Sequence, residues 1–280
     1  MNGAAAGGDA ARDAQGGVSV AVEGSIAVVS IERRAKLNAL SSFIELQLAA
    51  ALGSAEVRAS RCVVLTGGPE VFSAGADLSE MTGYDARAAL DYYDKSGGVY
   101  EQLATLPQPS VSAISGYCLG GGLELALATD FRVADESAVF GLPEVGIGIL
   151  PSSGGTVRLV RAIGPAKARE LVLVRPRFGA AEALSLGLVT EVVPTGGALS
   201  RAVELARQLS ALPPLAVRLA RRAIDAATES SRDVALLVEQ LAYAALSSGP
   251  GPQHAAPAEP AERAAPAEPD PSQRPREPAS

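Results

Sequence analysis

The chain has 280 residues, 48% of them hydrophobic, a formal net charge of -7 and a sequence pI near 4.9. This length and hydrophobic content are enough to bury a sizeable core. The acidic balance and the absence of any dense Lys/Arg block exclude the electrostatic footprint of a nucleic-acid binder. We therefore expect no nucleic acid among its partners.

The two cysteines, Cys62 and Cys118, are far apart in the sequence and have apolar or glycine neighbours. This pattern favours two buried free thiols in a reducing compartment over a disulfide framework. The first residues have neither the basic start nor the apolar run of a signal peptide, and later apolar stretches are too short to span a membrane. The sequence therefore predicts a cytoplasmic protein without a membrane partner.

Both ends of the chain are predicted to be disordered. Residues 1–16 contain mainly Gly, Ala and Asp without periodicity, and residues 249–280 are rich in Pro, Ala and Glu. Such compositions cannot bury enough apolar surface to offset the entropy of ordering the chain. The folded part is thus expected between these two segments.

Short β-branched runs alternate with helical patterns through the first part of the chain, which indicates an α/β fold. Runs at 18–24 and 26–32 predict a hairpin that turns at Glu23-Gly24. Ser41 or Ser42 is a candidate N-cap for the helix that follows. Further strands are predicted at 62–67, 111–116 and 131–135.

Helical patterns dominate the later part of the chain. One is predicted from about Asp85 to Leu106, with an interruption near Gly97-Gly98 and an end before Pro107. After Pro194, apolar residues recur at spacings of three and four. We therefore expect the helices there to be amphipathic, each with one buried face.

Two glycine-rich turns follow predicted strands, at 72–78 and 116–125. The second contains three consecutive glycines, 120–122, before a predicted helix. Glycine lets a ligand approach the backbone, and the free NH groups of a helix start favour an anion or a developing oxyanion. The alternative for the glycine triplet is that it only permits tight packing.

Glu124 and Glu144 are the candidate proton-transfer groups. Glu124 falls in the first turn of the helix that follows the glycines, and Glu144 follows Phe140-Gly141-Leu142-Pro143. Carboxylates in apolar, glycine-rich surroundings are typical of tuned acid–base chemistry. Two alternatives stay open at this point: Glu124 could simply complement the helix dipole, and Glu144 could be a surface-loop carboxylate.

Several other catalytic schemes lack their parts. His254, the only histidine, falls in the Pro-rich tail, which excludes a Ser-His-Asp triad, a Cys-His pair and histidine metal sites. No phosphate-binding Gly-Lys-Ser/Thr loop and no convincing GxGxxG turn is present. What remains is acid–base chemistry with oxyanion stabilisation.

The order of five motifs resembles that of the enoyl-CoA hydratase/isomerase (crotonase) superfamily, over about 18–248. The motifs lie at 31–40, 72–81, 116–134, 140–159 and 180–194. The resemblance implies a crotonase-like spiral core of ββα turns at 17–194. It also implies that the helical region 195–248 builds a homotrimer, often paired into a homohexamer.

The same resemblance implies roles for individual residues. The NH groups of Ala76 and Gly121 would hold the thioester oxygen, Glu124 would deprotonate a water, and Glu144 would deliver a proton to the α-carbon. The resemblance therefore predicts an enoyl-CoA hydratase with an acyl-CoA thioester as substrate and no separate cofactor. CoA would lie along Ala35, Lys36, Leu37, Ala74, Asp77 and Leu78.

Departures from the family pattern keep alternatives open. The chain passes at Gly249 into Pro and Ala where the family often has a further helix that closes over CoA. An isomerase, another acyl-CoA enolate enzyme and a catalytically weak acyl-CoA-binding scaffold are the alternative functions. Tyr92, Tyr93 and Tyr100 could line the acyl site, although we favour core or surface positions for them.

Overall fold

The computed structural model describes residues 15–81, 83 and 85–248. The predictions for residues 1–14 and for the tail 249–280, including His254, lie outside these described residues. In the described part, helices surround two β-sheets, which confirms the predicted α/β fold.

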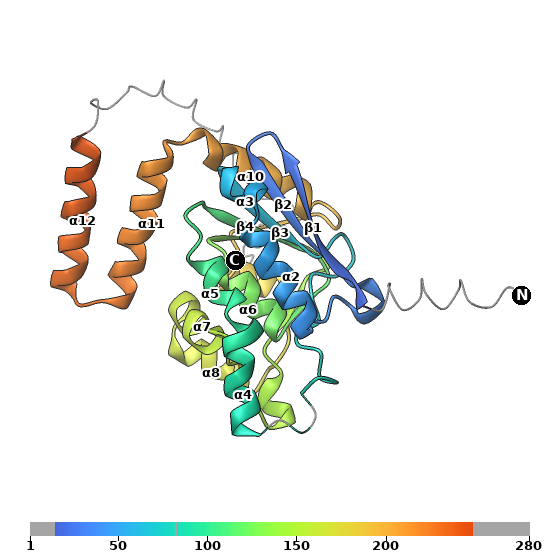
Figure 1. Cartoon of the computed structure of the whole chain (residues 1–280). Helices are drawn as coiled ribbons and strands as arrows, with labels where there is room; N and C mark the ends of the chain where they lie inside the picture. Colours follow the sequence, from blue (N-terminus) through green and yellow to red (C-terminus); the bar gives the residue numbers. More distant parts are fainter. Residues whose placement is uncertain (1–14, 82, 84, 249–280) are drawn as a thin grey trace, which may run out of the picture.

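The larger sheet has six strands among the described residues, in the order β1-β2-β3-β4-β6-β9. All neighbouring pairs are parallel except β1 and β2, which form the predicted hairpin (Figure 1). Glu23 pairs with Ile26, and Gly24 adopts a φ of +61°, which a glycine tolerates in a tight turn. The strands are β1 Gly17–Glu23, β2 Ile26–Glu32, β3 Cys62–Thr66, β4 Ser110–Ile114, β6 Phe131–Asp135 and β9 Glu191–Val193.

The smaller sheet consists of β5 Tyr117–Leu119, β7 Val139–Gly141 and β8 Phe178–Gly179. The sequence did not predict these strands, because two or three residues show no measurable alternation of apolar and polar positions. Strand β5 directly precedes the glycine triplet. This small sheet therefore fixes the position of the backbone directly before the glycine triplet.

Helices cover both faces of the larger sheet. Helix α10 (Ala198–Ala211) packs on β3, β4 and β6, while α2 (Ser42–Leu52) packs on β1 and β2. Ser41 is the N-cap of α2, because its side chain accepts a hydrogen bond of 3.3 Å from the NH of Ile44. The remaining helices of the core are η1 Arg34–Lys36, α3 Ala55–Ala59, α6 Gly121–Ala128, η3 Glu144–Ile147, α7 Gly155–Ile163, α8 Pro165–Leu173 and α9 Ala180–Ser185.

The predicted helix at 85–106 is divided into three parts. Helices α4 (Ala86–Tyr92) and α5 (Val99–Ala104) flank a π-helical turn, η2 (Tyr93–Gly97). A Cβ on Gly97 would lie 2.9 Å from Cε1 of Tyr92, so glycine permits this close contact. The predicted interruption is confirmed, and its form is a π turn.

Helices α11 (Pro214–Glu229) and α12 (Arg232–Ser247) form an antiparallel arm beside the main body (Figure 1). They pack mainly against each other, and neither contains a buried residue. The predicted buried face is therefore confirmed for α10 and wrong for α11 and α12 in the single chain. The physical reason is that no second layer within residues 15–248, as far as these are described, covers them.

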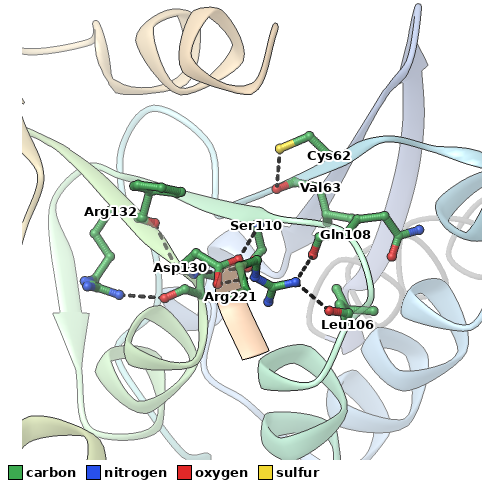
Figure 2. A network of polar contacts seen from close by, with 10 residues as sticks. Cys62, Val63, Leu106, Gln108, Ser110, Asp130, Arg132 and Arg221 are labelled. Atoms are coloured by element: carbon green, nitrogen blue, oxygen red, sulfur yellow. Dashed lines mark hydrogen bonds and ion pairs between the residues drawn. The ribbon is translucent and has the colours of Figure 1, made fainter. Parts of the chain in front are cut away.

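Arg221 ties the arm to the core (Figure 2). Its Nε lies 2.6 Å from Oδ1 of Asp130, and its Nη1 donates to the carbonyl oxygens of Leu106 and Gln108. Asp130 is fixed in turn by the NH of Ser110 at 2.7 Å. This partly buried ion pair determines how α11 leaves the core.

The prediction of two buried free thiols is confirmed for Cys62 and Cys118. Burial raises the pKa of the Cys62 thiol to about 12, and nearby Asp130 adds to the rise. Neither thiol is therefore poised for thiolate chemistry. Among the described residues, no helix is long and apolar enough to cross a membrane.

Candidate active site

The first glycine-rich turn is held between the segment before α2 and strand β5. The NH of Leu40 donates to the carbonyl of Gly75 at 2.8 Å, and the NH of Asp77 donates back to the carbonyl of Leu40 at 2.8 Å. On the other side, Ser73 exchanges hydrogen bonds with Tyr117 and Leu119. These bonds bring the turn at 72–78 against the turn at 116–125.

The NH groups of Ala76 and Gly121 lie close together at this junction. A Cβ on Gly121 would lie 3.6 Å from the nitrogen of Ala76. The ladder bonds to Leu40 use the residues on either side of Ala76, so the Ala76 NH points away from Leu40. Gly121 is the first residue of α6, so its NH has no acceptor within the helix.

Neither NH donates to an acceptor elsewhere in the described residues. Two adjacent backbone donors without internal partners are what an oxyanion site requires, because they need no reorganisation to meet a developing charge.

Glycine is required on both sides of this NH pair. Gly75 and Gly120 have φ values of +97° and +51°, in the region that side chains rarely adopt. A Cβ on Gly75 would lie 2.8 Å from the carbonyl oxygen of Leu119, and one on Gly120 would lie 3.0 Å from Oε1 of Glu144. The turns therefore approach each other more closely than larger residues would allow.

Glu124 projects from the first turn of α6 and is only 4% exposed. Its Oε1 accepts hydrogen bonds from the NH groups of Ser153 at 2.7 Å and Gly155 at 2.8 Å. Burial raises the pKa of this carboxyl, and the two backbone bonds oppose the rise. Its Oε2 takes no hydrogen bond from the described residues, so one oxygen stays available to a substrate or water.

Glu144 begins η3, and its carboxyl lies beside Gly120. Its Oε2 is buried and has no hydrogen-bond partner in the described structure. Burial raises the pKa of Glu144 to about 7, and the charge of Glu124 adds to the rise. The alternative of an ordinary surface-loop carboxylate is therefore wrong for Glu144. Glu124 is buried and accepts two backbone hydrogen bonds, whereas a residue that only complements the helix dipole requires neither.

The structure also brings together the segments predicted to lie along CoA. The NH of Ala74 donates to the carbonyl of Leu37 at 2.9 Å, which joins the turn to η1, where Ala35 and Lys36 lie. Leu37 and Leu78 are 49% and 55% exposed, so they offer apolar surface to a ligand. Their contact with CoA stays a prediction.

Asp77 has a structural partner that the sequence did not predict. Its Oδ2 lies 2.7 Å from Nη1 of Arg33, and both side chains are largely buried. Hydrogen bonds from Ser79, followed by those of Arg33, hold the pKa of Asp77 below its usual value. Asp77 therefore stabilises the turn as an anion.

The buried side chain of Asn38 connects its own segment to Arg33 and to the residues that precede the first glycine-rich turn. Its backbone adopts a φ of 54°, and its side chain is completely buried. The amide nitrogen donates to the carbonyls of Gly67 and Val71 at 2.8 Å each, and the amide oxygen accepts from the NH of Arg33. Asparagine suits this position because it tolerates left-handed backbone and supplies both donors and an acceptor.

A third buried carboxyl lies beside the site and was not predicted. Glu45 on α2 is 1% exposed, and its Oε1 accepts hydrogen bonds from the hydroxyls of Tyr92 and Tyr100. The signal in the sequence was a glutamate within the apolar stripe of α2, beside Ile44 and Leu48. Of the three tyrosines considered, Tyr92 and Tyr100 thus adjoin the site.

Comparison with known proteins identifies the family of the chain. The family model described as enoyl-CoA hydratase/isomerase matches residues 21–248. The chain belongs to this family. The short-chain-enoyl-CoA hydratase of Clostridium acetobutylicum is 38% identical over 223 residues, which cover 79% of this chain and 85% of that protein.

Another relative and a solved structure indicate the same family. YngF of Bacillus subtilis, named for the same family, is 42% identical over 220 residues, 78% of this chain and 85% of that protein. The crystal structure of an enoyl-CoA hydratase from Bacillus anthracis is 37% identical with a TM-score of 0.75, and the match covers 81% of this chain and 89% of that one. The fold is therefore that of the crotonase superfamily.

Proposed function

We propose that this chain is an enoyl-CoA hydratase that adds water across the double bond of a trans-2-enoyl-CoA. The observation that carries the proposal is the placement of two carboxyls, that of the buried Glu124 and that of the half-buried Glu144, beside one pair of free backbone NH groups. Those groups belong to Ala76 and Gly121. Membership of the enoyl-CoA hydratase/isomerase family supports the same reaction class.

The proposed mechanism assigns one task to each group. The NH groups of Ala76 and Gly121 bind the thioester oxygen and stabilise the enolate that forms. Oε2 of Glu124 removes a proton from water as its oxygen attacks the β-carbon, while Oε1 stays bound to the Ser153 and Gly155 NH groups. Glu144, whose pKa is raised to about 7, then gives its proton to the α-carbon.

The proposal includes the surroundings of the site. The acyl-CoA thioester is the substrate, its CoA part lies along 35–37 and 74–78, and no metal or redox cofactor takes part. We also propose a cytoplasmic homotrimer or homohexamer, because the arm exposes apolar side chains on both of its helices. They include Leu215, Ile224, Val234, Leu237, Leu241 and Tyr243.

The test follows the loss of the conjugated thioester absorbance of short- and medium-chain trans-2-enoyl-CoA. We expect Glu124→Gln and Glu144→Gln each to lower turnover by about 10² or more, the range for removing a positioned acid or base. Glu136→Gln, which changes an exposed glutamate, is the matched control and should keep full activity. A folded protein that binds acyl-CoA but hydrates no chain length would contradict the proposal.

Double-bond isomerisation is the second candidate, because the pKa of Glu144 is raised to about 7, which suits proton shuttling along one face of an enolate. The two reactions make different demands on Glu124. If Glu124→Gln abolishes hydration and leaves a shift of the double bond intact, isomerisation through Glu144 is supported.

A further inference from the structure

The carboxyl of Glu45 has one oxygen with two donors and one with none. Oε1 accepts from Tyr92 Oη at 2.6 Å and from Tyr100 Oη at 2.9 Å. Oε2 is buried and makes no hydrogen bond of normal geometry with the described residues. Buried polar atoms nearly always have a partner, so an unpaired one within a protein points to a ligand.

A second unpaired polar atom lies next to the first. The hydroxyl of Ser96 is buried and faces the carboxyl of Glu45, where its hydrogen bonding opposes the rise in the pKa of Glu45, but it makes no hydrogen bond of normal geometry among the described residues. Ser96 belongs to the π-helical turn η2. Such turns are frequent at functional sites because they reposition the side chains of a helix.

This group, which we call the polar wall (Glu45, Tyr92, Ser96 and Tyr100), adjoins the proposed active site at two points. The hydroxyl of Tyr100 lies 2.9 Å from the place that a Cβ on Gly121 would take. Tyr92 interacts with the side chain of Ser153, and the NH of Ser153 holds Glu124.

The position of the polar wall relative to the reaction follows from these contacts. Glu124 acts at the β-carbon in the proposed reaction. Its helix α6 packs against α5, which carries Tyr100, and the hydroxyl of Tyr100 lies beside Gly121, three residues before Glu124. The acyl chain continues from the β-carbon. In the proposed reaction, the remainder of the acyl chain would therefore extend toward the polar wall.

We propose that the polar wall binds a hydroxyl group on the acyl chain, so that the substrates are 2-enoyl thioesters hydroxylated beyond the β-carbon, with Glu45 as a specificity-determining residue. This inference rests on the proposed function. A plain alkyl chain would leave Oε2 of Glu45 and Oγ of Ser96 without a hydrogen bond of normal geometry, which sites of this kind discriminate against.

A hydroxyl fits this wall better than a charged group. Burial raises the pKa of Glu45, so its Oε2 can present either a lone pair or a proton. A hydroxyl both accepts and donates, and it satisfies Oε2 in either state. A carboxylate on the acyl chain would meet the charges of Glu45 and Glu124 when these are ionised.

The experiment measures binding, which does not depend on turnover. Isothermal titration compares hexanoyl-CoA with hydroxyhexanoyl-CoA isomers that carry the hydroxyl at successive carbons beyond the β-carbon. We expect one isomer to bind about tenfold tighter or more, the range for a buried hydrogen bond to an ionisable group. Glu45→Met and Ser96→Ala should each reduce this preference, and Glu136→Gln should leave it unchanged.

Each outcome decides the inference. Equal binding of hexanoyl-CoA and every hydroxy isomer overturns it, and so does a preference that persists in both variants. If Glu45→Met does not fold, Ser96→Ala still decides, because this substitution removes one oxygen atom. A protein that hydrates enoyl-CoA without any hydroxyl preference overturns only this inference, whereas hydroxyl preference without turnover contradicts only the hydratase proposal.

Discussion

At the scale of single residues, Glu124 and Glu144 have different surroundings, which affect their pKa values differently. Glu124 accepts two backbone hydrogen bonds from Ser153 and Gly155 that favour its ionised form, whereas only the backbone of Glu144 itself opposes the rise in the pKa of Glu144. Burial raises the pKa of both, and that of Glu144 reaches about 7. Near neutral pH, Glu144 is therefore suited to carry a proton and Glu124 to accept one.

This difference predicts the pH dependence of the proposed hydration. Glu144 must be protonated to act as the acid, so kcat/KM should fall as the pH rises through about 7. The measurement is kcat/KM over about pH 6 to 9 with one enoyl-CoA. Glu136→Gln should reproduce the wild-type curve, and a profile that stays flat above pH 7 would contradict the assignment.

Sequence reasoning identified the glutamates and the glycines, because each stands at a recognisable place in a motif. It did not identify Glu45 or the NH groups of Ser153 and Gly155. These partners come from segments about 30 or more residues away from the groups they meet, and only the folded chain brings them together. Backbone donors in particular leave no trace in residue identity.

At the scale of elements, Asn38 connects three segments that carry the site. Replacing it with leucine removes several buried hydrogen bonds and places a bulky residue at a φ of 54°. We expect the free energy of unfolding to fall by about 3 kcal/mol or more, since unpaired buried polar groups cost about 1–3 kcal/mol each. Urea denaturation followed by circular dichroism measures the loss.

Asn38→Gly distinguishes the loss of the hydrogen bonds from the strain of a bulky residue at a positive φ, because glycine accepts the left-handed backbone and still lacks the amide. It should be destabilised by the lost hydrogen bonds alone, and therefore less than Asn38→Leu. Wild-type stability in Asn38→Gly would show that these bonds do not hold the turn.

The longer elements could be predicted and the shortest could not. The hairpin and strands β3, β4 and β6 have enough β-branched residues to show a pattern. Strands β5, β7 and β8 exist because the neighbouring backbone supplies their hydrogen bonds, as in the pairing of Cys118 with Phe140. The π turn η2 likewise depends on the packing of tyrosine rings against Gly97.

At the scale of the whole molecule, the arm of α11 and α12 is the part whose environment the sequence did not determine. Its apolar periodicity was visible, but periodicity alone does not say which surface covers an apolar face. The structure shows that the core of the same chain does not. Arg221 fixes the arm to the core, and its apolar side chains stay exposed.

We expect this surface to be covered in an oligomer. Leu237→Asp, which puts a charge at a position 53% exposed in the single chain, should lower the molar mass measured by light scattering. Gln240→Asp on the same helix is the control, because it places the same charge at an exposed polar position. A wild-type mass equal to one chain would contradict the proposed trimer or hexamer.

The two backbone bonds to Glu124 both end on Oε1, so they hold its carboxyl in one place and one orientation. A carboxylate anchored through one oxygen cannot exchange its two oxygens by rotation without losing both bonds. In the proposed reaction, water is then always presented by Oε2, from one side of the planar double bond. The product should accordingly be a single mirror-image form of the β-hydroxyacyl thioester.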